Sequence, residues 1–303
     1  MGKNPFTPAV IIILRNTRLR IISMLGILMI LSLSIYQQCL SQLIASVIGR
    51  NDSSHGVFVP FIAAFFLWEQ RSKIKKLAPE FALFPGSILV LCSLTILLVP
   101  ENNFATMLSA VSFFIMAAGL ALAFFGKKIF KELSPPLFFL MTMIPLPDPL
   151  YMQIAEWMRY INTDNAVFIT QLFGIPFERS GYYLQFPDIL LYVGVSCSGI
   201  RYLISYFVFG LAYAFFYKKS TVSRILVLAS ILPISIFASS VRLSVIFLAV
   251  HYIGAWTTDR IPHNFLSWSV FCFFLAAALW MDGKLSPYYE RLLSKETKVR
   301  SGY

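Results

Sequence analysis

Long apolar segments, separated by short clusters of lysine and arginine, are the feature that most restricts how this chain can fold. The apolar windows lie near residues 21–37, 56–70, 80–99, 105–125, 134–149, 189–217, 225–250 and 264–281. Most of them approach the ~20 residues that a helix needs to cross a bilayer. No repeated ten-residue alternation is visible, which argues against a membrane β-barrel. We therefore predict an all-α, polytopic membrane helix bundle with about eight transmembrane helices, forming one domain over residues 1–303.

The basic residues predict the orientation of this bundle. If each window is one span, 19 of the 25 lysines and arginines fall on one side of the membrane. The other side carries Arg50, Arg159, Arg179 and Arg260. Because cytoplasmic loops are enriched in lysine and arginine, both termini are predicted to be cytoplasmic, with residues 282–303 as a short tail. The net charge of +11 is then explained by topology rather than by nucleic-acid binding.

The N-terminal apolar segment and the longest outer loop add two further expectations. No small-residue cleavage site follows the window at 21–37, so that window is expected to remain as a span. In the loop at 150–188, aromatic and apolar residues alternate with charges up to Phe173, which is typical of a helix in the membrane interface. After Gly174-Ile175-Pro176, the aromatic stretch 182–187 is predicted to be extended.

Four reactive side chains stand out, and three of them, Cys197, Arg242 and His263, fall near the outer boundary of the predicted bundle. Arg201 and Arg242 lie inside spans, where an ionisable residue is costly and is therefore a functional candidate. Cys197 is expected about two turns into the window 189–217, and Arg242 in the outer half of the window 225–250. His263 is expected at the first turn of the last span. This placement follows from the charge distribution alone.

These residue types suit acyl transfer through a thioester. A cysteine thiolate is a nucleophile, and a nearby guanidinium or helix N-terminus favours it. Arg201 follows Cys197 by four residues, so the two are expected on one helix face. A histidine can pass the proton to the leaving amine, and an arginine can hold the developing oxyanion. His251 and His55 are competitors for the role of His263. The cysteines have no CxxC spacing, so no metal site and no cofactor is expected.

Other interpretations of the same residues remain open at this point. A cysteine in an apolar span is more often inert packing, and arginines near a span end can snorkel or bind lipid phosphate. The chain could then be a multi-pass transporter with arginines as substrate ligands. It could also be a non-catalytic assembly partner in polysaccharide export.

From about residue 50 to 281 the sequence resembles the exosortase/archaeosortase family of membrane-embedded cysteine transpeptidases. Residues 54–60 resemble an early Ser-His-Gly-x-Leu-Val-Pro stretch that contains His55, and 197–201 match the signature Cys-Ser-Gly-x-Arg. The middle landmarks Ile144-Pro145-Leu146-Pro147 and Gly174-Ile175-Pro176 are similar too. Arg242 matches the family's arginine, and His263, five residues before Trp268, matches its histidine. The chain departs at Ser239, where the family usually has asparagine, and at Ser267, where it usually has glycine.

The resemblance implies a thiol protease or transpeptidase of the cell inner membrane, with its active site on the outer face. Cys197, Arg242 and His263 would be catalytic, supported by Arg201, His55, Ser239 and Trp268. The substrates would be secreted proteins with a C-terminal tail of motif, transmembrane helix and basic cluster. The acceptor nucleophile is unknown. Such protein-sorting systems accompany exopolysaccharide and biofilm assembly. No fused domain is expected beyond the short tail 282–303.

Overall fold

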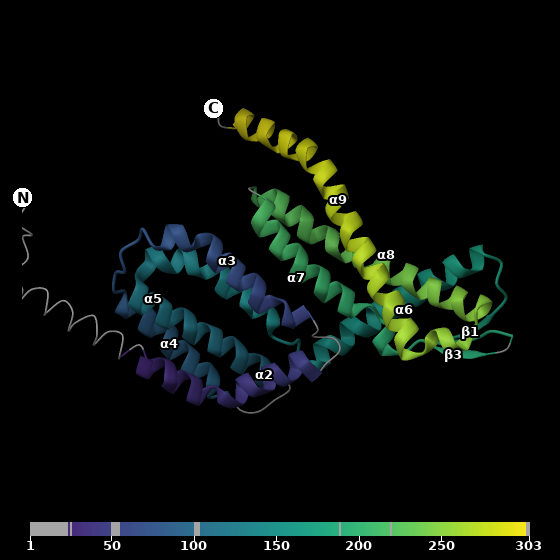
Figure 1. The fold of residues 1–303 in the computed structure, drawn as a ribbon, viewed down its shortest axis with the longest axis horizontal. Helices are drawn as coiled ribbons and strands as arrows, with labels where there is room; N and C mark the ends of the chain where they lie inside the picture. The colour runs from purple at the N-terminus through teal and green to yellow at the C-terminus, as the bar shows by residue number, and fades with distance from the viewer. Residues whose placement is uncertain are drawn as a thin grey trace, which may run out of the picture. The chain divides into compact units, whose positions relative to one another are not determined.

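The computed structural model is nearly all helical and divides into two compact units. It describes residue 24 and residues 26–49, 55–99, 104–187, 189–218 and 220–300 (Figure 1). Parts of the predicted span 21–37, and Ser54 of the early motif, lie outside these ranges. The first unit comprises residues 1–49 and 64–145, and the second comprises residues 50–63 and 146–303.

The first unit is built from short apolar helices and one long one. Its elements are a helix at Gly26–Ile35, α2 (Gln37–Gly49), most of α3 (Val59–Ile74), α4 (Leu83–Leu97), α5 (Ala105–Leu140) and the 3₁₀ turn η2 (Met141–Met143). The helix at Gly26–Ile35 is bent by 66° from Gln37–Val47. Small residues let α4 and α5 approach closely: a Cβ added at Gly86 would lie 2.5 Å from Cβ of Ala123. Such contacts are typical of helices that pack in lipid.

The predicted spans at 105–125 and 134–149 fall on two helices that meet at a kink within α5. At the kink, Gly126 has non-helical backbone angles, with φ of 77° and ψ of 174°, which glycine adopts and which strain other residues. Helix α6 then begins at Asp148. Among the described residues, four helices are long and apolar enough to cross a membrane, or five if the bent pair is one span. The structure therefore shows a multi-pass helical membrane protein, while the count of about eight spans is not confirmed.

The second unit holds the reactive residues. It contains the first residues of α3, up to residue 63. Its further elements are α6 (Asp148–Leu172), β1 (Glu178–Ser180), β2 (Tyr183–Gln185), β3 (Leu190–Tyr192), η3 (Val195–Cys197), α7 (Ile200–Tyr217), α8 (Thr221–Tyr252), η4 (Ala255–Thr258) and α9 (Arg260–Arg300). The three strands form one antiparallel sheet in the order β1-β2-β3. The predicted extended stretch 182–187 is confirmed as β2 and its flanks. The window 189–217 begins with β3, so its helical part starts later than predicted.

Helix α6 confirms the helix predicted within residues 150–188, while its place in the membrane interface stays a prediction, and it buries a stripe of polar residues. The stripe recurs at helical spacing and includes Arg159, Asn162, Thr163 and Thr170. Asn162 accepts a hydrogen bond from Ser240 of α8, with 3.1 Å between Oγ and Oδ1. Interhelical hydrogen bonds of this kind contribute about 0.6 kcal/mol each in membrane proteins. The opposite side of α6 exposes large apolar residues, as expected of a helix that faces lipid.

The sheet is held on α6 by arginines that the charge count had placed in the outer loop. The guanidinium of Arg159 is buried and lies 3.4 Å from the ring centroid of Tyr182. It also donates a hydrogen bond to Glu156, at 3.1 Å. Arg179 of β1 pairs with Asp164 of α6 at 2.6 Å. These cation–π and ionic contacts fix the strands that lead to Cys197.

A buried ionic cluster joins the end of α7 to α9. Lys218 is 3% exposed, and its Nζ lies 2.5 Å from Oδ2 of Asp282. Tyr213 and Tyr289 each donate a hydrogen bond to the same carboxylate, at 2.7 and 2.6 Å. Burial lowers the pKa of Lys218, but its hydrogen bonds to Asp282 and Tyr289 outweigh burial and leave that pKa above its ordinary value. The expected tail at 282–303 is thus a continuation of α9 as far as Arg300.

Candidate active site

Cys197 ends the short 3₁₀ turn η3, directly before α7. Its N–H donates to the carbonyl of Gly194 at 2.9 Å, and its side chain is partly exposed. Gly199 separates this turn from α7 with a left-handed φ of 84°. The expectation that Cys197 and Arg201 share one helix face is therefore wrong, because the two residues lie in different elements. Instead, Arg201 folds back and donates from Nη2 to the carbonyl of Ser196 at 3.1 Å.

The turn packs against α8 and α6 through Gly199. A Cβ added at Gly199 would lie 2.1 Å from Oγ of Ser239 and 3.0 Å from Nδ2 of Asn162. Asn162 is fully buried and donates to the carbonyl of Ser198 at 2.6 Å. Ser239 is fully buried as well, and its hydroxyl has no hydrogen-bond partner among the described residues. Ser239 therefore contacts the backbone of the signature and does not hydrogen-bond to Arg242.

Gly199→Ala is expected to disturb the cysteine turn. The left-handed conformation costs a non-glycine residue about 1–2 kcal/mol, and the new Cβ would overlap Ser239. We expect a lower melting temperature in detergent and a changed rate of Cys197 alkylation by iodoacetamide. Gly194→Ala is the matched control, because its φ is −73° and the nearest atom to an added Cβ lies 3.5 Å away. Equal behaviour of the two variants would contradict this role of Gly199.

Arg242 of α8 ties the cysteine turn to α9. Its Nη2 donates to the carbonyl of Cys197 at 2.9 Å, and its Nη1 lies 3.4 Å from Oγ of Ser267. Its guanidinium carbon lies 5.1 Å from the ring centroid of Tyr202. The side chain is 3% exposed, and Nε has no hydrogen-bond partner among the described residues. The two terminal nitrogens of Arg242 thus have hydrogen-bond partners, while its Nε–H has none among the described residues and can donate to a ligand.

Ser267 links the arginine to the helix turn that carries the histidine. Its hydroxyl donates to the carbonyl of His263 at 2.7 Å, and its own carbonyl accepts from the phenol of Tyr202 at 2.5 Å. A glycine at this position would lack the hydroxyl. The serine at position 267, where the family usually has glycine, therefore adds a direct contact between its hydroxyl on α9 and the guanidinium of Arg242.

Cys197 and His263 line one cavity of about 300 Å³, here called the cysteine cavity. Its remaining walls come from β3 and its flank, η3, the C-terminal half of α8, and η4. They are formed by Leu191, Tyr192, Val193, Ser196, Leu243, Ile246, Phe247 and Thr258. His251 does not line this cavity; its ring packs beside Tyr252, with centroids 4.8 Å apart. The structure thus places His263, rather than His251, in the same space as the thiol.

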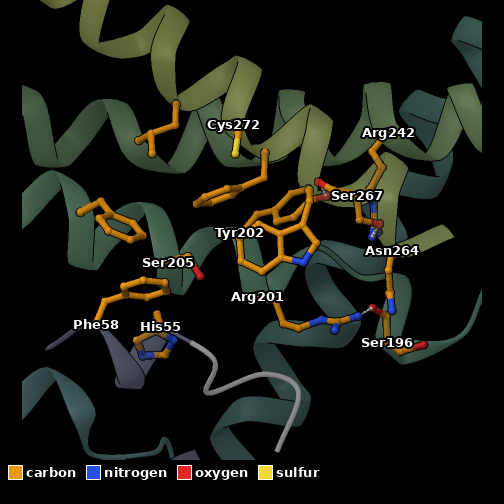
Figure 2. Close-up of a pocket in the computed structure, with 15 residues that line it drawn as sticks. His55, Phe58, Ser196, Arg201, Tyr202, Ser205, Arg242, Asn264, Ser267 and Cys272 are labelled. Atoms are coloured by element: carbon orange, nitrogen blue, oxygen red, sulfur yellow. Dashed lines mark hydrogen bonds between the residues drawn. The ribbon is translucent and has the colours of Figure 1, made fainter. Parts of the chain in front are cut away.

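A second cavity of about 380 Å³, here called the arginine cavity, shares Ser196 with the first. Arg201, Arg242, His55 and Trp268 all line it. Figure 2 shows His55 and Phe58 on one side of this space, with Arg242, Ser267 and Asn264 on the other. Six of the seven residues proposed from the sequence thus line one of two adjoining cavities. The seventh, Ser239, lies behind Gly199.

Sequence reasoning missed the residues that connect these groups. Asn162 and Tyr202 contact the signature or its arginine through hydrogen bonds and ring contacts, and neither was a candidate. A signal for Asn162 was present, since small polar residues recur at helical spacing in α6. No comparable signal marks Tyr202, which is one of many aromatic residues in the spans.

The fold and the site together define a class of protein. It is a helical membrane protein that holds a cysteine, a histidine and an arginine around adjoining cavities. The family model described as transmembrane exosortase matches residues 47–280. The chain belongs to the transmembrane exosortase family. No curated protein and no solved structure matches the chain.

Proposed function

We propose that the protein is a membrane cysteine protease or transpeptidase that cleaves C-terminal sorting tails of secreted proteins. The observation that carries this proposal is that Cys197 and His263 line one cavity while Arg242 donates to the carbonyl of Cys197. Nucleophile, proton carrier and cationic donor are thus within one unit of the chain. Family membership and the match to the Cys-Ser-Gly-x-Arg signature support the same activity.

In the proposed reaction, the Cys197 thiolate attacks the carbonyl carbon of the scissile peptide bond. Donors of Arg242 hold the oxyanion that forms. The bond from carbon to nitrogen then breaks, and His263 gives its proton to the departing amine. The secreted part remains on Cys197 as a thioester. Water or an amine acceptor next attacks the thioester, His263 takes up a proton from it, and the thiolate is restored.

The location of this chemistry is part of the proposal. The distribution of basic residues supports an inner-membrane protein with cytoplasmic termini and a site on the outer face. A secreted substrate with a single transmembrane helix would then present its motif directly to Cys197. Release of such substrates would serve surface polysaccharide and biofilm assembly.

Trapping the thioester tests the proposal. The probe is a reporter fused to the tail of a protein from the same cell that carries motif, apolar helix and basic cluster. In membranes containing the full chain, we expect a covalent adduct between Cys197 and the N-terminal part of the reporter. Neutral hydroxylamine should release this adduct, and a membrane-impermeant maleimide added outside should prevent it. Cleavage without an adduct would contradict the mechanism. A transporter or non-catalytic assembly partner would give neither cleavage nor adduct.

A further inference from the structure

The arginine cavity extends from the cysteine turn along two parallel candidate spans, α7 and α9. On α7 its lining runs from Arg201 through Ser205 to Phe209, and on α9 from Asn264 to Leu275. At 1.5 Å per residue, these stretches cover about 12 and 16 Å of helix. The cavity therefore reaches well inside the spans, whereas the cysteine cavity is lined by β3, η3 and η4, by the C-terminal part of α8 and by the first turn of α9.

The polarity of the lining changes along the same direction. Polar groups, Arg201, Arg242 and Asn264, lie at the end next to the cysteine turn. Phe209, Phe271 and Leu275 lie further along the helices, with Phe58 6.1 Å from Phe209 between ring centroids and His55 as an ionisable side chain in that part of the lining. Figure 2 shows Cys272 and Ser205 away from the cluster of Arg242, Ser267 and Asn264. A ligand that fits this gradient is polar where it leaves Cys197 and apolar a few residues later.

We propose that the arginine cavity binds the part of the substrate that follows the cleavage point. The residues just after the scissile bond contact the arginine end, and the first apolar side chains of the tail helix occupy the Phe209–Leu275 end. The cysteine cavity then holds the residues that precede the bond. This inference rests on the proposed function, and it assigns the two cavities to the two sides of the scissile bond.

Three observations favour a polypeptide tail as the occupant. The cavity adjoins Cys197 through Ser196, so a chain cleaved there must pass its opening. About 380 Å³ is within the size of ligand pockets, so it holds a few side chains and leaves the helix itself outside. In its most apolar 18-residue window, only 6% of α9 is buried, which leaves the helix open to a partner helix in lipid.

Photocrosslinking in the Cys197→Ala chain, which retains uncleaved reporter, tests the assignment. A photoreactive residue at Ser205 should capture the reporter after its cleavage point, and one at Leu191 should capture it before that point. If residue 205 captured the part before the cleavage point and residue 191 the part after it, the proposal would be overturned. Capture of lipid alone at residue 205, together with capture of the reporter at residue 191, would also overturn it. If neither position captures the reporter, the proposed function fails as well as the assignment of the cavities. Failure of the assignment alone is recognised because residue 191 still captures the reporter.

A matched pair of filling variants provides the functional test. Ser205→Trp places an indole in the arginine cavity, and Ala276→Trp places one on α9 at an exposed position outside it. We expect Ser205→Trp to slow processing of the reporter about tenfold or more, while iodoacetamide alkylates Cys197 at the unchanged rate. Ala276→Trp should process normally. Normal processing by Ser205→Trp, or equal loss in both variants, would contradict binding of the tail in this cavity.

Discussion

Cys197→Ala is expected to abolish processing and to leave uncleaved substrate in the membrane. Loss of a covalent nucleophile lowers turnover on the order of 10⁶-fold in a well-studied protease. The fold should persist, because the contacts that fix the turn are made by the backbone of Cys197, through its N–H to Gly194 and its carbonyl to Arg242. Quantification of full-length and cleaved reporter, with a melting curve of the purified variant, measures both effects.

The other cysteines provide the controls for this result. Cys92 is exposed on α4 in the first unit, so Cys92→Ala should process the reporter normally. Cys272 lines the arginine cavity, where the loss of one sulfur atom enlarges the space only slightly, so Cys272→Ala should also process it. Normal cleavage by Cys197→Ala would refute the enzyme proposal altogether.

Arg242→Lys is expected to insert and fold but to process substrate roughly 100- to 1,000-fold more slowly, the loss typical of one oxyanion donor. Lysine keeps the charge and loses the planar fork, so it cannot reach the Cys197 carbonyl and Ser267 together. The rate of Cys197 alkylation separates two causes. An unchanged rate indicates that the arginine acts on the substrate, whereas a changed rate indicates that it positions the thiol.

Arg201→Lys is the matched comparison for Arg242→Lys. Arg201 makes one hydrogen bond to the Ser196 carbonyl and is less buried, so lysine should replace it with a smaller loss. If Arg242 only extends its charge to the membrane interface, lysine can replace it, because lysine snorkels equally well. Arg242→Lys would then process the reporter at the rate of the unmodified protein. If Arg201→Lys were inactive while Arg242→Lys processed normally, the oxyanion role would belong to α7.

Much of this arrangement was predictable because hydropathy and charge determine which segments enter a membrane. The helical class, the helix in the outer loop and the extended stretch at 182–187 were all expected. The grouping of Cys197, Arg242 and His263 in one part of the molecule was predicted as well. Their catalytic roles stay predictions.

The differences arise where backbone geometry overrides hydropathy. Lys127, Lys128 and Lys131 suggested a loop between two spans, but the structure has only a kink at Gly126, after which a second helix begins at once. Likewise, the apolar residues 189–193 fit a helix by composition and instead complete the small sheet. The glycine of the signature breaks the helix between Cys197 and Arg201, which spacing along an ideal helix could not anticipate.

The polar stripe on α6 also has a consequence for how the protein is made. Asn162 and its partner Ser240 are 78 residues apart, which at 5–20 residues per second is a delay of about 4–16 s during synthesis. Helices form within about a microsecond, so α6 exists long before its partner emerges. Until then its amides and hydroxyls depend on water at the membrane surface. The carbonyl of Cys197, which accepts a hydrogen bond from Arg242, thus gains its partner only after α8 has been made, and the cysteine turn stays incomplete until most of the chain is in place.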